Sequence, residues 1–263
     1  MGRIAELLGI ARSVLLYADN PLQSRRAARF YAQFIRTGDL YFDIGAHLGS
    51  RVGPVVRLGA RLVAVEPQPN LAKIIRRWYA GNPRVQVVEK AVGAAPGQQA
   101  LLICERAPTV STLSTDWIHQ VKKSPKWEGI EWRQSVSVTV TTLDCLIDQY
   151  GEPAFCKIDT EGYEYEVVRG LTQPLRALSF EYNPLAPDIV HQAIDRLAVL
   201  GDYEFNPAPG DDLRFAWPEW RDAAELRTWL RNLPPESPVG NIYARLSHWG
   251  NRRDAQERPF HSS

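Results

Sequence analysis

The chain has 263 residues, of which 23% are charged and 44% hydrophobic, and its formal net charge is +1. These values are ordinary for a soluble globular protein, and the length fits one α/β domain with appendages better than two small domains. The near-zero charge excludes a chain-wide electrostatic footprint for nucleic acid. Three scattered cysteines give neither a disulfide framework nor a C-x-x-C clip, and they fit a reducing cytoplasm.

The N-terminal part is expected to be helical. Apolar residues between positions 4 and 16 share one helical face, and two charged residues interrupt the run, so it is neither a signal-peptide core nor a membrane span. A second helix is expected at about 22–36, before a Thr-Gly-Asp stop. We expect residues 1–37 to form a helical cap that covers the sheet or lines the substrate entrance.

A glycine turn follows the first expected strand. The β-prone residues 40–44 end at Gly45 and Gly49, and a helix is expected from about 50 to 58. Glycines let a ligand approach the backbone, and the free N–H groups and dipole at a helix start favour an anionic group. His47 is expected to contact the ligand through its backbone. The junction therefore predicts a site for a nucleotide-like cofactor.

Two acidic residues indicate which cofactor binds. Asp43 suits an ammonium or a hydroxyl and would repel a pyrophosphate, so it fits the methionine end of S-adenosylmethionine. Glu66-Pro67 ends a second buried strand at 61–65, where an acid usually binds a ribose diol. NAD enzymes also bind the ribose with an acid at this position, but the turn after the first strand lacks their G-x-G-x-x-G motif. The pattern favours a methyltransferase over a nicotinamide-dependent oxidoreductase.

The middle of the chain changes its pattern. After a helix at 70–80 and a third strand at 85–88, two longer alternating strands at 99–104 and 136–141 are expected to pair with each other. The polar excursion between them, about 105–135, is typical of a lid or substrate loop. Two interpretations are open for the side chains of this segment. Trp117 and Trp127 either pack within the lid or stack on an acceptor. Ser111 and Thr112 either belong to a polar loop or line the acceptor pocket.

Acidic residues also end the later core strands. The strand at 154–158 leads into Asp159 and Glu161, and the strand at 178–180 leads into Glu181. Because ligands bind beyond the carboxyl ends of parallel strands, the strand-end acids Asp43, Asp159 and Glu181 should converge on one crevice. The remaining expected elements are a short helix at 143–150 capped by Thr142, helices at 163–169, 189–200 and 222–231, strands at 203–205 and 241–246, and a polar tail at 247–263.

Five motifs in order resemble the FkbM family of S-adenosylmethionine-dependent methyltransferases between about residues 38 and 184. They are F-D-I-G-A-H-L-G at 42–49, V-E-P at 65–67, K-A-V-G at 90–93, V-T-T-L-D at 140–144 and K-I-D-T-E-G-Y-E at 157–164. The resemblance implies a class I methyltransferase fold over residues 38–246. That is an α/β, Rossmann-like fold with a seven-stranded, mostly parallel sheet, an antiparallel last strand and flanking helices.

The resemblance also implies methyl transfer, commonly to a hydroxyl of a sugar, glycan or natural product, and a set of site residues. The methionine end would be held by Asp43, Gly45, Ala46 and Gly49, the ribose by Glu66, and the adenine edge by Lys90 and Ala91, with Asp159 and Glu161 facing the methyl-transfer site. The implied partner is a small-molecule or glycan acceptor, with no nucleic acid and no integral membrane segment.

Several alternatives stay open. Asp159 is our hypothesis for the general base, but it could instead orient the cofactor or cap the helix that follows. Glu161 could be a first-turn helix acid. Asp159, Glu161 and Glu181 could bind a divalent cation, although hydrogen-bonded contacts are expected, and the five histidines lack an H-x-x-x-H pair for zinc. A catalytically inactive cofactor-binding module would be expected to lose some of these acids.

Overall fold

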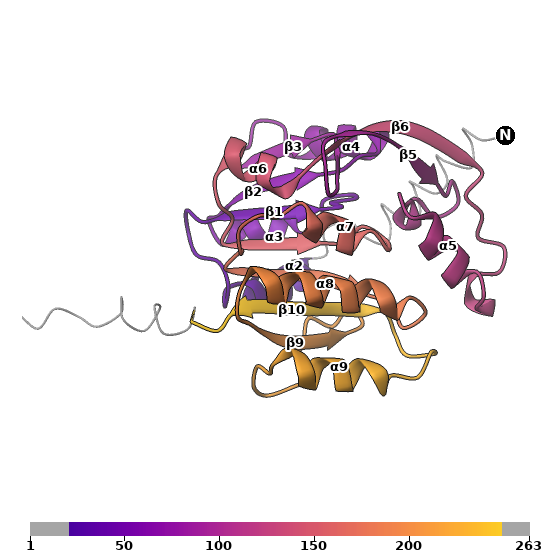
Figure 1. The fold of residues 1–263 in the computed structure, drawn as a ribbon. Coiled ribbons are helices and arrows are strands. Elements are labelled where there is room, and N and C mark those ends of the chain that lie inside the picture. The colour runs from indigo at the N-terminus through magenta and orange to yellow at the C-terminus, as the bar shows by residue number, and fades with distance from the viewer. Residues whose placement is uncertain (1–20, 249–263) are drawn as a thin grey trace, which may run out of the picture.

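The computed structural model describes residues 21–248, in which a seven-stranded sheet runs through the centre (Figure 1). Its order is β3-β2-β1-β7-β8-β10-β9. The bounds are β1 Leu40–Ile44, β2 Arg61–Val65, β3 Val85–Val88, β7 Phe155–Ile158, β8 Ala177–Tyr182, β9 Tyr203–Pro209 and β10 Gly240–Leu246. Neighbours pair in parallel except β10, which is antiparallel to β8 and β9. The expected class I methyltransferase sheet, with an antiparallel last strand, is confirmed.

Helices cover both faces of this sheet because its strands are apolar on both sides. Tyr41 and Phe155 belong to one core with α2 (Pro21–Tyr31), α3 (Val52–Arg57) and α4 (Pro69–Trp78). Their chain neighbours Phe42 and Cys156 point to the opposite core. That core is closed by α6 (Leu143–Tyr150), α7 (Glu164–Arg169), α8 (Pro187–Leu200) and α9 (Ala223–Arg231). The carboxyl ends of β1, β2 and β7 therefore lie at one edge between the two helical layers.

A second sheet carries the excursion. It has the order β4-β6-β5, with bounds β4 Ala91–Val92, β5 Gly97–Ile103 and β6 Gln134–Thr141, and the expected antiparallel pairing of β5 with β6 is confirmed. The excursion contains η1 (Pro108–Val110), α5 (Thr115–Val121) and η2 (Pro125–Trp127). Trp117 is buried, with its ring centroid 5.1 Å from that of Trp127 and 5.9 Å from that of Trp132. Packing, rather than exposure to an acceptor, is thus the observed arrangement of Trp117.

Two elements differ from expectation. Helix α2 ends at Tyr31, where Phe34 and Ile35 both donate to the Tyr31 carbonyl and close a terminal turn that buries their side chains. Strand β9 runs to Pro209 because it pairs with the whole of β10. Its two prolines are tolerated because β9 is an edge strand, so their missing N–H groups interrupt no ladder on the outer side.

Some of the remaining expectations concern the two ends of the chain, and others concern a helix cap and the domain boundaries. The expected helix at 4–16 and residues 249–263 lie outside the described residues. Thr142 caps α6 as expected, accepting a hydrogen bond from the backbone N–H of Cys145. Among residues 21–248, no helix has the length and apolarity needed to cross a bilayer. The domain boundaries at residues 37 and 246 and the role of the segment 105–135 stay predictions.

Candidate active site

The turn after β1 is built from backbone hydrogen bonds to β2. The N–H groups of Gly45 and Ala46 both donate to the Val65 carbonyl, at 2.9 and 3.0 Å, and the N–H of His47 donates to Glu66 Oε2 at 2.8 Å. We expected these groups to face a ligand, and the structure differs because they join the ends of two strands. Helix α3 begins only at Val52 and has six residues.

Position 45 requires glycine both because a side chain would have no room there and because the backbone has a positive φ. Its φ is +77°, and a Cβ at this position would lie 1.8 Å from the backbone oxygen of Asp159. Gly49 also has a positive φ, of +74°, and its Cβ would lie 3.0 Å from a methyl carbon of Val52. The glycines therefore let the end of β1 press against the end of β7 and let the chain enter α3.

Glu66 is a buried carboxylate held by backbone groups. Its side chain is 3% exposed, and besides the bond from His47 it accepts one from the N–H of Gln68, at 2.9 Å on Oε1. Burial raises the pKa of Glu66 to about 7, against the lowering effect of these backbone hydrogen bonds. Each carboxylate oxygen has further lone pairs, so Glu66 can still accept bonds from a vicinal diol.

A first cavity opens beside Glu66 and encloses about 530 Å³ of empty space, part of it open to solvent. Most of the expected cofactor residues line it, namely Gly45, His47, Glu66, Pro67, Lys90, Ala91 and Asp159. Gln68, Thr109, Ser111 and Thr112 join them. Ser111 and Thr112 thus lie on the side of the expected cofactor residues and not on the side we considered for an acceptor. Gln68 ties the excursion to this cavity by donating to the Pro108 carbonyl at 3.1 Å.

A second, larger cavity adjoins the first and encloses about 1160 Å³, again including open solvent. Asp43 and Ala46 line this cavity, and Gly49 lines neither one. Other residues on its wall are Arg51, Val110, Trp127, Lys157, Glu181, Asn183 and Asn241. The two cavities share Gly45, His47, Thr109, Asp159 and Glu161, so they meet at the carboxyl end of β7.

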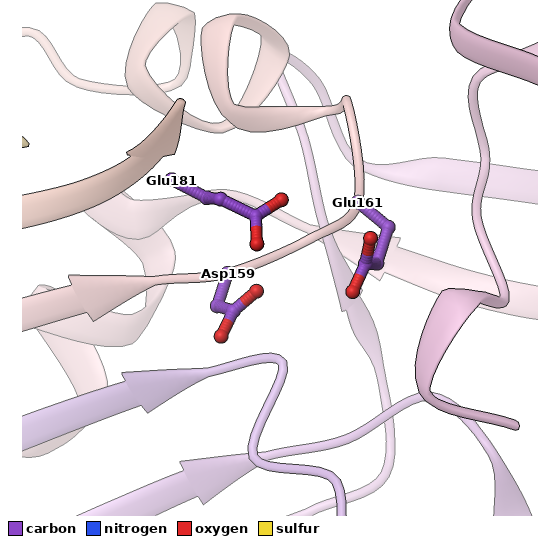
Figure 2. A group of neighbouring side chains, drawn as sticks. All are labelled: Asp159, Glu161 and Glu181. Carbon is purple, nitrogen blue, oxygen red and sulfur yellow. The ribbon is translucent and has the colours of Figure 1, made fainter. Parts of the chain in front are cut away.

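Three carboxylates cluster where the cavities meet. Oxygen atoms of Asp159, Glu161 and Glu181 all lie within 4.8 Å of one another, and their side chains point toward one another from β7, β8 and the turn before α7 (Figure 2). The expected convergence is seen in the second cavity, whose wall includes Asp43, Asp159 and Glu181. Glu181 lies inside β8 rather than after it. This spacing also suits a divalent cation, so a metal remains an alternative to hydrogen-bonded contacts.

The three acids have different electrostatic surroundings. Burial opposes the charge of Asp159, but Lys157, whose Nζ is 2.6 Å from Asp159 Oδ2, lowers its pKa below the usual value. Burial and the neighbouring carboxylates raise the pKa values of Glu161 and Glu181 well above the usual range. Asp159 is consequently the weakest base of the three, while the two glutamates bind protons more tightly.

The start of α7 is held by an acid that our sequence reading passed over. Glu164 Oε1 accepts bonds from the N–H of Thr160 at 2.8 Å, from its hydroxyl at 3.1 Å and from the N–H of Gly162 at 3.3 Å. Asp159 and Glu161 are thereby left for the cavities rather than for helix capping. The signal was present as the last residue of the K-I-D-T-E-G-Y-E motif. Glu161 itself sits in a left-handed turn, with φ +53°.

Asp43 is the least satisfied group of the site. Its side chain is 1% exposed, and neither carboxylate oxygen has a hydrogen-bond partner within the part of the chain that the structure describes. Burial raises its pKa, against the lowering effect of Lys157 and Arg51. A buried acceptor without donors is costly unless a ligand supplies them. An ammonium group in the second cavity would do so, and the residues present therefore fit the methionine end of S-adenosylmethionine.

Comparisons with solved structures return methyltransferases at low identity. A precorrin-6y C5,15-methyltransferase from Geobacter metallireducens has 15% identity and a TM-score of 0.44, with 84% of this chain and 86% of that chain covered. An O-methyltransferase from Bacillus cereus, solved with SAH, has 15% identity, a TM-score of 0.44 and coverage of 94% and 90%. Fibrillarin from Aeropyrum pernix, solved with S-adenosyl-L-methionine, has 11% identity, a TM-score of 0.45 and coverage of 83% and 76%.

Among curated proteins, no sequence matches this chain. A family model does: the methyltransferase FkbM domain matches residues 43–233, which is most of the chain and includes every residue that lines the first cavity. This match sets aside the nicotinamide-dependent oxidoreductase. The chain belongs to the FkbM family of methyltransferases, whose methyl donor is S-adenosylmethionine.

Proposed function

We propose that the protein transfers the methyl group of S-adenosylmethionine to a hydroxyl group of a sugar, a glycan or a natural product. The observation that carries the proposal is the meeting of two cavities at Asp159 and Glu161. One cavity has the residues expected for the nucleoside part of the cofactor. The other is larger and polar, and it holds carboxylates that can accept a proton from an acceptor.

The charges of the second cavity favour a cationic cofactor. Its wall has five acidic side chains, Asp43, Asp159, Glu161, Glu181 and Asp211, against two cationic ones, Arg51 and Lys157. Burial lowers the pKa of His47 to about 4, so its ring adds no positive charge at pH 7. S-adenosylmethionine carries a sulfonium and an ammonium against one carboxylate. A pyrophosphate would be repelled by the same wall.

Each part of the cofactor has candidate partners. Glu66 would accept hydrogen bonds from the ribose hydroxyls, and Asp43 would accept hydrogen bonds from the ammonium. Lys90 and Ala91 would border the adenine. The sulfonium supplies an already electrophilic methyl group, so the protein has to position the acceptor, exclude water and take up a proton.

Glu181 fits the role of general base better than Asp159. Asp159 forms an ion pair with Lys157, and its lowered pKa makes it a poor proton acceptor. Of these two cavities Glu181 lines only the second, where the acceptor would bind, and burial and the neighbouring carboxylates raise its pKa, which makes it a stronger base than Asp159. In this proposal Glu161 supports Glu181 as a neighbouring carboxylate within 4.8 Å, and Asp159 keeps Lys157 in place beside the cofactor.

The segment 105–135 is proposed to select the acceptor. It contributes Thr109, Val110 and Trp127 to the second cavity. The Trp127 ring is stacked with Trp132, with centroids 6.0 Å apart, so it offers a fixed aromatic wall. An aromatic wall beside carboxylates and the amides of Asn183 and Asn241 suits a hydroxylated ring with an apolar face.

The test is transfer of an isotope-labelled methyl group. Purified protein is incubated with methyl-labelled S-adenosylmethionine and a panel of neutral glycosides, hydroxylated natural products and primary amines, and products are located by mass spectrometry and carbon NMR. Label on a hydroxyl oxygen supports the proposal, and label on nitrogen alone contradicts it. Binding of S-adenosylhomocysteine without transfer to any acceptor would favour the inactive cofactor-binding module. Glu181→Gln is the matched control for background transfer.

A further inference from the structure

A half-buried arginine lines the same cavity as Asp43. Arg51 directly precedes α3 and lies on the wall of the second cavity. Its Nε is buried without a hydrogen-bond partner, and its guanidinium takes part in none of the ion pairs found within residues 21–248. An arginine keeps its charge at any pH at which proteins fold. A cation in this position is therefore short of acceptors.

Arg51 and Asp43 do not satisfy each other. They are close enough to interact electrostatically, yet Asp43 has no hydrogen-bond partner, and the charged atoms of the two side chains lie more than 4.0 Å apart. A buried carboxylate and a half-buried guanidinium that do not pair with each other are costly. A ligand that brings both an anion and a cation would satisfy each of them at once.

Lys157 does not compete for this role. Its Nζ is already 2.6 Å from Asp159 Oδ2, and its side chain is 7% exposed. Arg51 instead has the tyrosines Tyr31, Tyr41 and Tyr243 near enough to interact with it electrostatically. Neutral phenols do not neutralise a guanidinium, so its charge is available to a ligand in the cavity whose wall Arg51 lines.

We propose that Arg51 binds the α-carboxylate of S-adenosylmethionine while Asp43 binds the α-ammonium. The two groups sit on one carbon of the ligand and match two neighbouring charges of opposite sign on the protein. A guanidinium is planar and can bind a carboxylate with two parallel hydrogen bonds. Arg51 is thus a positioning residue that orients the methionine end, and the inference rests on the proposed cofactor site.

The experiment compares three ligands that differ in these groups. They are S-adenosylmethionine, its decarboxylated analogue, and 5′-methylthioadenosine, which lacks the whole amino-acid part. Dissociation constants are measured by calorimetry for the full chain and for Arg51→Gln, with Arg57→Gln, an exposed arginine of α3, as matched control. Arg51→Gln should weaken S-adenosylmethionine about tenfold to a hundredfold, as for a lost hydrogen bond to a charged group. The other two ligands should keep their affinities, and Arg57→Gln should change none.

Other results would overturn the inference. Equal weakening of all three ligands by Arg51→Gln would mean that Arg51 only supports the fold, and an unchanged affinity for S-adenosylmethionine would mean that it does not meet the carboxylate. If Arg51→Gln fails to fold by circular dichroism, Arg51→Lys gives the same comparison, because it keeps the charge and loses the two-bond geometry. Failure of the unmodified protein to bind any of the three would instead refute the cofactor site itself.

Discussion

Lys157 Nζ lies 2.6 Å from Asp159 Oδ2, and the two ends of this ion pair differ in exposure, 7% for the lysine side chain and 32% for the aspartate. Burial works against the charge of Lys157, but Asp159 and Asp43 raise its pKa. One buried ammonium therefore compensates the acids at the ends of β1 and β7. It also limits the repulsion that Glu161 and Glu181 experience.

Lys157→Met should destabilise the fold in a pH-dependent way. The change leaves the acidic cluster without its buried cation, and we expect a loss of about 2–4 kcal/mol at pH 7, below the upper range for buried pairs because Asp159 is one-third exposed. Without the lysine, the raised folded-state pKa values of Asp43, Glu161 and Glu181 rise further, and the lowered pKa of Asp159 rises too. The folded variant then binds protons more tightly, so its deficit should shrink as the pH falls toward 5.

Urea unfolding at pH 7 and pH 5 measures this difference. The double variant Lys157→Met, Asp159→Asn is the control, and it should recover part of the lost free energy because the unpaired charge is gone. A loss of equal size at both pH values would show that the loss does not arise from the ionisation of these carboxylates.

The pH profile of turnover should identify the base. A general base acts when deprotonated, so kcat should rise with pH through the raised pKa of Glu181, at a pH above the ordinary glutamate range. Glu181→Gln should lower kcat by a factor of about 10²–10⁴ and remove this rising part (limb) of the pH profile. Asp159→Asn should retain the limb, since Asp159 has a lowered pKa. Loss of the limb in Asp159→Asn, with Glu181→Gln unaffected, would return the role of base to Asp159.

The parts of the site that could be predicted from the sequence depend on signals local in the chain. Buried parallel strands read as short apolar runs, and the residue after each run must lie at the carboxyl edge of the sheet. Glu66 and Asp159 were located in this way, Asp43 was located as the acid near the end of the first run, and Lys90 and Ala91 followed from the motif order. The edge itself brings them together, so no knowledge of side-chain contacts was needed.

The remaining features depend on contacts between segments that are distant in sequence. Nothing near Arg51 in the chain distinguishes it from a surface arginine, and only the folded turn aims it at the cavity of Asp43. Trp117 lies in a polar stretch, but it is buried against Gly162, where a Cβ would lie 2.1 Å from its ring. The Lys157 pairing likewise decides which acid is the weakest base, and spacing alone does not reveal it.

Affinity for the cofactor should depend on the ionisation of Glu66. Ribose hydroxyls donate to a carboxylate, so binding favours the ionised form, and the pKa of about 7 places the change near neutrality. The dissociation constant of S-adenosylhomocysteine should be constant above pH 8 and rise by up to about tenfold per pH unit below 7. Calorimetric titrations from pH 5.5 to 8.5 measure it. Glu66→Gln, with the same shape and no titration, should bind weakly at every pH; a pH dependence that survives in it would belong to another group.

Gly45→Ala should disrupt the junction of β1 with β7, and Gly38→Ala is its matched control. Both glycines have a positive φ, +77° and +88°, so both variants carry the strain of a left-handed alanine, about 1 kcal/mol. A Cβ on Gly38 meets nothing within 4 Å, whereas on Gly45 it would lie 1.8 Å from the Asp159 carbonyl oxygen. We therefore expect Gly38→Ala to lose only about 1 kcal/mol in urea unfolding. Gly45→Ala should lose at least about 3 kcal/mol and its binding of S-adenosylhomocysteine, because Asp159 must move. Equal losses in the two variants would mean that the conformation, and not the close approach of the two strands, is what requires glycine at position 45.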